Sequence, residues 1–285
     1  CHYDTGNASG QLWARYTGSI IEIGCIAPQS PARYLNNVYW IGGDNRSGSV
    51  GIFTNEGLLP KRISTRGIEQ IMSGLSSLST AYGFCYSQAG HAFYVLQFPE
   101  SGRTLVYDIV TDAWHERSFL DPDTGALGCW PVGGVGSIAG AVFAGDLKSN
   151  GLLEITFEHA VNDILEAGTH SQILCEKTTP ILFSDGVQQR INEIQIVANH
   201  GAGLSVDDSR GSGKDPKVMI SMSRDFGRTW NNERILPLGR IGEYNRRTRS
   251  IGWGMGRNIL FRIRYSEPTP FLLVAIVVNA QPMER

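Results

Sequence analysis

The sequence lacks any arrangement of cysteines that would support a disulfide framework or a zinc cluster. Its five cysteines are odd in number, widely spaced and never in a C-x-x-C pair: Cys1, Cys25, Cys85, Cys129 and Cys175. Disulfide-rich domains and structural zinc sites depend on paired, closely spaced cysteines. The pattern therefore predicts reduced thiols, most of them buried, in a chain that folds in a cytosol of the bacterial type.

Long hydrophobic runs and an excess of one charge are also missing. The longest apolar run, 270–278, is too short to cross a bilayer, so we predict a buried strand there and no membrane-spanning segment. The formal net charge is −2 and charged residues make up 18% of the chain, which argues against a global nucleic-acid or membrane binder. The chain begins at Cys1 without a signal-peptide pattern, and we expect it to be the C-terminal part of a longer protein.

The motifs of common catalytic sites are absent as well. There is no G-x-S-x-G and no P-loop, and none of the six histidines has metal-ligand spacing such as H-x-x-x-H. The carboxylate pairs Asp121/Asp123 and Asp207/Asp208 stand in polar, turn-like segments, where solvated loop acids are the simpler interpretation. The sequence therefore predicts a protein that is not an enzyme, with no catalytic, cofactor-binding or metal-binding residues.

What the sequence does contain is glycine, 34 of 285 residues, and short apolar runs separated by turns. The runs 91–98 and 103–110 flank Pro99–Gly102, a pattern that predicts a hairpin. A second hairpin is predicted from the runs 38–41 and 50–53. Apolar residues at helical spacing between Ile68 and Leu75 predict one short helix near 66–76.

Strand pairs recur at a spacing of roughly 40–50 residues, which is typical of propeller blades. The segment 106–117 resembles the third and fourth strands of a kelch-like blade, whose aromatic residues pack between neighbouring blades. We therefore predict an all-β, β-propeller-like protein with an Asp-box hairpin and a β-rich C-terminal closing region. The predicted division is 1–170 for propeller blades, with the helix, and 171–285 for C-terminal blades or the closing region.

The Asp box lies at residues 223–230 and matches the pattern S-x-D-x-G-x-T-W at every defined position: Ser223, Asp225, Gly227, Thr229 and Trp230. Asp225 is short enough to accept hydrogen bonds from its own turn, and Gly227 can adopt the positive φ of a tight hairpin. Trp230 supplies a large apolar anchor. Asp boxes are familiar from β-propellers, including sialidases, where they lie away from the catalytic centre, so we interpret this one as a structural staple.

Ten arginines, no lysine and three acidic residues lie between Arg224 and Arg264, a local charge of +7 that leaves −9 for the rest of the chain. Exposed or intramolecularly paired arginines explain this pattern without any function. The functional interpretations are contact with nucleic-acid phosphate or an interface with an acidic neighbouring subunit, because arginine binds phosphate and carboxylate bidentately. We favour the interface, and the candidate residues are Arg246, Arg247 and Arg249.

Several phrases occur in an order that resembles one family, the packaged-DNA stabilisation proteins, or tail nozzle/hub proteins, of short-tailed bacteriophages. In the C-terminal half the phrases are Ser221–Trp230, Leu238–Tyr244, Arg246–Arg249 and Phe261–Pro268. In the middle they are Pro60–Thr65, Gly90–Leu96, Thr104–Asp108 and Trp114–Arg117. The resemblance covers most of residues 35–280.

This resemblance implies a structural virion protein of the tail, assembled in the host cytoplasm. Such proteins form a ring, usually a hexamer, below the portal and its adaptor protein. They extend the DNA channel, retain the packaged DNA, and support a tail needle or tailspikes. The implied partners are therefore further copies of the chain, the portal adaptor, a needle or tailspike, and packaged DNA in the channel.

The alternative is a carbohydrate-binding or glycan-hydrolysing, sialidase-like β-propeller. A sialidase has repeated Asp boxes and an N-terminal F/Y-R-I-P motif, whereas this chain has one good Asp box. Its closest phrase, Phe261–Arg264, lies at the opposite end and lacks the proline. An enzyme should also gather acids and aromatic residues in the propeller funnel.

Glycan turnover separates these two interpretations. We expect no hydrolysis of sialosides, other glycans or host surface polysaccharide, because the sequence offers no nucleophile with a base, no metal site and no catalytic acid pair. The measurement is product release on prolonged incubation. Hydrolysis that a single acidic substitution in the funnel abolishes would contradict the structural interpretation.

Overall fold

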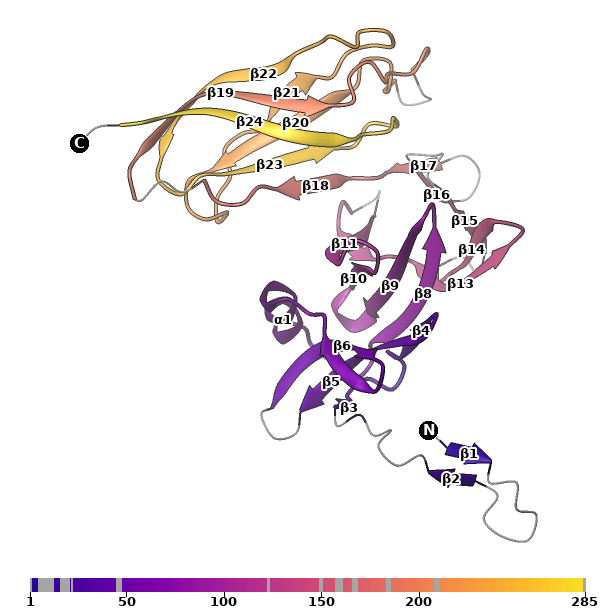
Figure 1. The fold of residues 1–285 in the computed structure, drawn as a ribbon. Helices are drawn as coiled ribbons and strands as arrows, with labels where there is room; N and C mark the ends of the chain where they lie inside the picture. Colours follow the sequence, from indigo (N-terminus) through magenta and orange to yellow (C-terminus); the bar gives the residue numbers. More distant parts are fainter. Residues whose placement is uncertain are drawn as a thin grey trace. The chain divides into compact units, whose positions relative to one another are not determined.

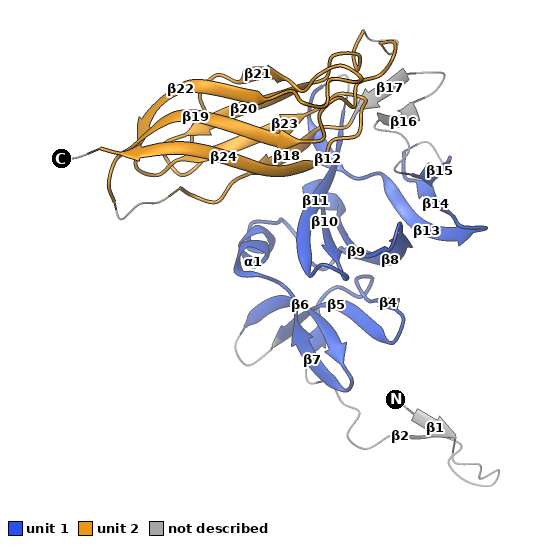
Figure 2. Cartoon of the chain, turned by 45° about the horizontal axis from the view of Figure 1, so that its top comes forward, with its two compact units in different colours: residues 1–156 blue, residues 157–285 orange. Residues whose placement is uncertain are grey.

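The computed structural model describes residues 2–4, 13–15, 21, 23–44, 48–121, 124–148, 151–156, 161–165, 169–182, 186–207 and 211–283. The chain divides into two compact units, residues 1–156 and 157–285 (Figure 2). The boundary predicted from the sequence, after residue 170, lies further along the chain, inside strand β17 (Thr169–Gln172). No run of glycine, proline or serine marks residue 156, so composition gives no signal there.

The first sheet of the N-terminal unit is an antiparallel meander (Figure 1). Its strands are β3 (Gly24–Cys25), β4 (Ala32–Tyr34), β5 (Asn37–Asp44), β6 (Ser49–Glu56) and β7 (Leu59–Arg62). The order is β3-β5-β6-β7, with β4 also paired to β5. The hairpin predicted from 38–41 and 50–53 is therefore present as β5 and β6.

The helix α1 (Arg66–Ser73) follows this sheet. Thr65 caps its N-terminus by accepting a hydrogen bond from the Ile68 backbone N–H, the usual role of threonine at this position. Ile68 and Met72 are buried on one face, as their i, i+4 spacing predicts. The helix predicted near 66–76 is thus present and ends three residues earlier than predicted, at Ser73.

The second sheet has five antiparallel strands in the order β12-β11-β10-β9-β8. They are β8 (Tyr82–Gln88), β9 (His91–Phe98), β10 (Arg103–Asp108), β11 (Ala113–Leu120) and β12 (Leu127–Cys129). A short 3₁₀ helix, η1 (Pro99–Ser101), forms the predicted turn between β9 and β10. Every residue of β9 from Ala92 to Phe98 is buried, which requires cover on both faces of the sheet.

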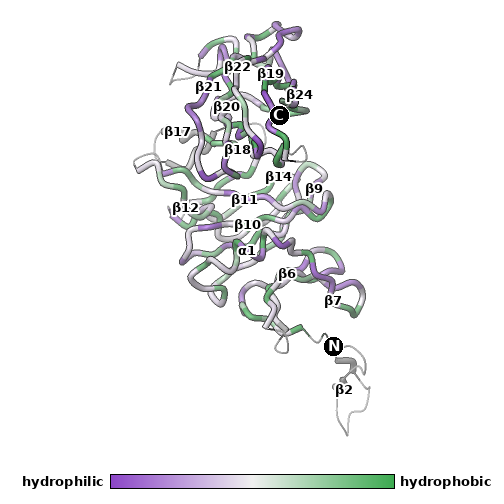
Figure 3. Tube along the Cα trace, turned by 90° about the vertical axis from the view of Figure 1, so that its left-hand side faces the viewer, coloured by the Kyte–Doolittle hydropathy of each residue, from purple (hydrophilic) through white to green (hydrophobic). Residues whose placement is uncertain are grey.

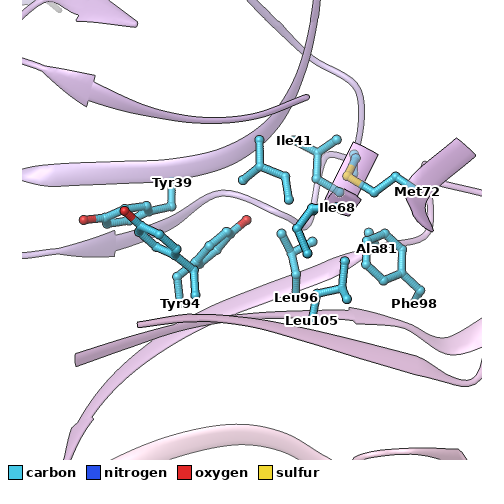
Figure 4. Close-up of a cluster of buried hydrophobic side chains, with 12 residues drawn as sticks. Tyr39, Ile41, Ile68, Met72, Ala81, Tyr94, Leu96, Phe98 and Leu105 are labelled. Carbon is cyan, nitrogen blue, oxygen red and sulfur yellow. The ribbon is translucent and has the colours of Figure 1, made fainter. Parts of the chain in front are cut away.

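One face of this second sheet packs on the first sheet and α1. Tyr94, Leu96 and Phe98 share a core with Tyr39, Ile41, Ile68 and Met72 (Figure 4). The Tyr94 hydroxyl donates to the Ser30 carbonyl at 2.9 Å, and Trp114 Nε1 donates to the Ile63 carbonyl at 2.9 Å. Aromatic residues of the kelch-like phrase therefore lie between neighbouring sheets, as predicted.

The other face packs on a third sheet, β13-β14-β15. Its strands are β13 (Val132–Ile138), β14 (Ala141–Asp146) and β15 (Leu152–Ile155). The alternate residues of β9, Phe93 and Val95, share this second core with Val132 and Val142. The period-2 alternation of a strand thus gives β9 one set of side chains for each neighbouring sheet.

The C-terminal unit has two antiparallel sheets around one core. One sheet contains β18 (Cys175–Thr178), β23 (Leu260–Tyr265), β20 (Lys217–Ser223) and β21 (Arg234–Pro237), in that order. The other contains β22 (Thr248–Gly256), β19 (Gln189–Ala198) and β24 (Leu273–Pro282), in that order. Trp253 and Phe261 meet edge to face across this core, with ring centroids 5.7 Å apart, so the unit is a β-sandwich.

Two hairpins complete the described strands: β1 (His2–Asp4) with β2 (Trp13–Arg15), and β16 (Val161–Leu165) with β17. The regular secondary structure of the described residues is therefore almost entirely β, and the all-β prediction is confirmed. Residues 201–216 contain no strand or helix in their described part, although Gly201, Gly203 and Gly213 are buried.

Gly83 controls how closely the first and second sheets approach each other. A Cβ atom at Gly83 would lie 2.1 Å from the Ser30 carbonyl oxygen, whereas nothing lies within 4 Å of one at Gly145 in β14. We expect Gly83→Ala to lower the free energy of unfolding by about 1–3 kcal/mol or more, since backbone must move. Chemical denaturation measures this, with Gly145→Ala as the matched control. Equal stabilities of the two variants would contradict the close approach.

Candidate functional site

The Asp-box residues form a closed hydrogen-bond network in the turn between β20 and β21. Asp225 Oδ1 accepts from the Thr229 backbone N–H at 2.8 Å and from Ser223 Oγ at 2.7 Å, and Asp225 Oδ2 accepts from Thr229 Oγ1 at 2.6 Å. Ser223 Oγ also accepts from the Gly227 N–H at 2.9 Å. Gly227 has φ +85°, the left-handed conformation that its position in the motif requires.

These hydrogen bonds favour the ionised form of Asp225. The Thr229 hydroxyl, the Thr229 backbone N–H and Ser223 together lower the pKa of Asp225 from 3.8 to about 2. Both carboxylate oxygens accept hydrogen bonds from residues of the same turn. The network therefore stabilises the turn of the hairpin.

Trp230 lies outside the sandwich core. Its ring is half-buried, and the Arg262 guanidinium lies over it at 4.5 Å from the ring centroid. Trp230, expected from the sequence to be a large apolar anchor, therefore makes a cation–π contact on the face of the sheet. The fully buried tryptophan of this unit is Trp253, in β22.

Much of the Arg-rich segment serves the sandwich itself. Arg264 binds Glu176 at 2.7 Å and Glu233 at 3.1 Å, and so links β18, β23 and the segment before β21. Arg234 lies over the Trp253 ring at 4.1 Å and donates to the carbonyls of Ile251 and Gly252. A high local arginine count here reflects intramolecular contacts to a large extent.

The three candidate interface arginines differ in their surroundings. Arg246 binds Glu243 at 2.7 Å in the loop after β21, and Arg249, in β22, lies 3.7 Å from Glu193. Arg247 is exposed and makes no side-chain ion pair or hydrogen bond with any residue that the structure describes. These three residues are equal candidates from sequence, but of the three only Arg247 is exposed without such a contact among the described residues.

The loop that carries Arg246 and Arg247 also exposes apolar surface. Ile241 and Tyr244 are 60% and 70% exposed, and residues Gly242–Arg246 line a shallow hollow. Gly239 and Gly242 have positive φ, which gives the loop its turns. The Arg246 side chain, and then the Arg240 backbone N–H, hold the pKa of Glu243 below its usual value. We call Ile241, Tyr244 and Arg247 the loop surface.

The most enzyme-like group in the described residues is a histidine–aspartate pair that the sequence did not single out. His91 Nδ1 lies 2.8 Å from Asp108 Oδ2, and Asp108 also accepts from Thr111 Oγ1 and the Val110 N–H. Burial would raise the pKa of Asp108, but the bonds from Thr111, His91 and Val110 outweigh it and lower the pKa. The same bonds close the turn between β10 and β11, so the pair has a structural explanation.

A second histidine, His115 in β11, lies on the same face of this sheet as His91, and the rings of both histidines contact Phe93. Partial desolvation beside these rings, and then the adjacent Arg117, lower the pKa of His115 to about 4. The Arg117 guanidinium lies within 4.8–5.7 Å of the ring centroids of Phe93, Trp130 and Tyr86. The Arg117 side chain therefore occupies the space between these rings, and the cluster packs against one face of the second sheet.

The four described cysteines, Cys25, Cys85, Cys129 and Cys175, are free thiols. Cys25 and Cys175 are exposed, and the other two are half-buried, so the prediction of mostly buried thiols is wrong. Burial raises the pKa of Cys85 to about 12. Within the described ranges, no group of three or more His, Cys, Asp or Glu residues has the geometry to hold a metal ion. Asp123 and Asp208, each one member of a carboxylate pair, lie outside the described residues.

Two family models match the chain in sequence. The model described as bacteriophage P22 Gp10, beta-propeller matches residues 2–148, and that described as bacteriophage P22 Gp10, beta-sandwich matches residues 175–281. The chain belongs to the bacteriophage P22 Gp10 family. The three stacked sheets correspond to the propeller model and the two-sheet unit to the sandwich model. The Gp10 family forms the phage tail nozzle and stabilises packaged DNA, so this chain is a structural protein of a phage tail.

Similarity to other solved structures adds nothing to the Gp10 assignment. An exo-β-1,3-galactanase of Phanerochaete chrysosporium with galactose is 11% identical, with a TM-score of 0.19 and 88% of this chain and 56% of that chain covered. A family 43 arabinoxylan arabinofuranohydrolase of Bacillus subtilis with cellotetraose is 9% identical, with a TM-score of 0.23 and coverages of 90% and 54%. The chain thus spans about half the length of these enzymes, and TM-scores this low carry no argument. No curated protein matches the sequence, and no described helix is long and apolar enough to span a membrane.

The Asp-box network makes a specific pH dependence testable. Because the pKa of Asp225 is lower in the folded chain, its contribution to stability is complete above its ordinary pKa of 3.8 and is lost as the pH falls towards about 2. We expect Asp225→Asn to be less stable than wild type at neutral pH, with the difference narrowing over that window. Denaturant unfolding between pH 7 and pH 2 measures it.

Glu154→Gln is the matched control, because Glu154 is exposed and has no ion-pair or side-chain hydrogen-bond partner among the described residues. It should unfold like wild type at every pH. A constant difference between wild type and Asp225→Asn across the whole range would show that the charge of Asp225 plays no part.

Proposed function

We propose that this chain forms a ring, a hexamer as its resemblance implies, below the portal and its adaptor protein in the tail of a short-tailed phage. The observation that carries the proposal is the order of the two matches, propeller then sandwich, which together cover most of the chain. The ring extends the DNA channel and retains the packaged genome. Its further partners are a tail needle or tailspikes, and it assembles in the host cytoplasm.

The role is structural and not catalytic. The family supports this, since its members are structural tail proteins. The local chemistry agrees with a structural role. The carboxylates of Asp225 and Asp108 accept hydrogen bonds from their own turns. The raised pKa of the Cys85 thiol disfavours the thiolate that a nucleophile needs. The glycan-acting alternative has no such support from the described residues.

The loop surface is the best candidate for a contact between subunits. Ring closure repeats one heterologous contact around an axis, so a basic patch on one subunit meets a different patch on the next. Arg247, in the same loop as exposed Ile241 and Tyr244, supplies a cation without an ion-pair partner among the described residues, and the chain outside the Arg-rich segment has a formal charge of −9. Such charges set register and specificity more than affinity.

Charge reversal in the loop tests this contact. We expect Arg247→Glu to fold normally but to reduce ring assembly, and the triple reversal of Arg246, Arg247 and Arg249 to reduce it further. Native mass spectrometry and complementation of a phage lacking the protein provide the measurements. Arg228→Glu, another exposed arginine without a described partner, is the control and should assemble normally. Wild-type titre and ring formation in the triple variant would exclude the loop surface from the contact.

DNA retention tests the function itself. Particles made without the chain should package DNA and then lose it, whereas particles made with the wild-type chain should protect it from nuclease. The readout is nuclease-resistant DNA per capsid. Full retention in particles that lack the chain would overturn the proposed function, whatever the outcome for Arg247.

A further inference from the structure

The outer strands of the sandwich differ in how their free edges are protected. The outer strands are β22 and β24 in one sheet and β18 and β21 in the other. An outer strand has a row of backbone N–H and C=O groups without partners, and it can pair with a strand of another chain. Soluble proteins prevent this with short strands, charges, proline, bulges or a covering group.

Three of these four strands have such protection. β18 and β21 are four residues long, and they contain Glu176 and Lys177 in one and Arg234 and Pro237 in the other. β22 is longer, but Gly252 and Gly254 interrupt its extended conformation with φ values of +72° and +84°.

Arginine side chains also cover the carbonyl groups of β22. Arg234 donates to the carbonyls of Ile251 at 2.6 Å and Gly252 at 2.8 Å. Arg224 donates to the Trp253 carbonyl at 3.0 Å. A second chain therefore finds three successive acceptors of this strand already occupied.

β24 has such devices only at its ends. Its register against β19 shifts at Val274, which forms a bulge near the start of the strand, and its one proline, Pro282, is the last residue. The strand is ten residues long and carries no charged residue. It pairs with β19 along one edge, and no described residue pairs with its other edge. The strand lies at the margin of its sheet in Figure 1, and Figure 3 shows its apolar stretch in green.

The side chains of β24 also leave this edge open. Val274 and Val277 are 66% and 53% exposed, and Ala275 is exposed as well. Ile276 and Val278 contact the core but are only half-buried. An added strand would therefore bury apolar surface on both faces of the sheet.

We propose that β24 pairs with β24 of a second copy of this chain, antiparallel, around a two-fold axis at Ile276. A strand without charge lies against its own copy without opposing like charges. In this register Ala275 lies opposite Val277 of the second copy, and both positions are C-terminal to the bulge at Val274. A two-residue shift of the axis towards the C-terminus would set polar Asn279 against Val277. The pairing joins two three-stranded sheets into one, is isologous, and does not depend on the proposed ring.

Two double substitutions at exposed positions test both the contact and its register. Ala275→Lys with Val277→Lys places like charges directly opposite each other at two symmetric places, so we expect dimerisation at least about tenfold weaker. Ala275→Glu with Val277→Lys places opposite charges at the same two places, so dimerisation should return to near the wild-type level. The measurement is sedimentation velocity of the full chain over a concentration series.

Ile251→Lys is the matched control, because Ile251 is exposed on the protected strand β22 of the same sheet. It should dimerise like wild type, and circular dichroism checks the fold of every variant. If a double variant fails to fold, hydrogen–deuterium exchange of wild-type β24 at low and high concentration decides, with protection expected only at high concentration. A monomeric wild-type chain, an assembly that the Lys/Lys variant leaves unchanged, or loss of dimer in both double variants overturns the proposal.

Discussion

The N-terminal unit depends on the burial of both faces of its second sheet. Strand β9 contributes alternate side chains to two different cores, with Tyr94 and Leu96 on one side and Phe93 and Val95 on the other. Its neighbours therefore need not form large cores of their own. Polar contacts then set the spacing, since the Tyr94 hydroxyl binds the Ser30 carbonyl and Gln97, itself buried, donates to the Trp130 and Val132 carbonyls. A stack of sheets held this way is the basic arrangement of a propeller.

The sequence predicts most of this architecture because strand burial shapes local patterns. The apolar run 91–98 is continuous since both faces of β9 are covered, and the helix is visible because Ile68 and Met72 are on one face. Strands such as β13 and β22 have no continuous apolar run in the sequence because glycine interrupts them: Gly133, Gly134 and Gly136 in one, Gly252 and Gly254 in the other. Composition signals a turn at such positions, and pairing with β14 and β19 overrides it.

The candidate site could be predicted only in part, for a different reason. The Asp box is a local motif whose donors and acceptor lie within seven residues, so its network follows from the sequence. The state of an arginine depends on partners far along the chain. Arg264 finds Glu176, 88 residues away, and Arg249 finds Glu193 across the β19–β22 pair. A count of arginines cannot distinguish these two paired residues from Arg247, because only the fold shows which arginine has an acidic partner.

The arginines of the sandwich also show why charge density alone is a poor guide to an interface. Arg234 and Arg224 occupy carbonyls along β22, and Arg262 and Arg264 tie the opposite sheet together through Glu233. Most of the positive charge that marks this segment thus stabilises the unit and closes one of its edges. Strand β24 has no charge to signal its importance, yet its free edge is the longest unprotected backbone among the sandwich's described outer strands. Two kinds of surface therefore remain available for assembly: unpaired cations, which select a partner, and an uncharged strand edge, which binds backbone to backbone.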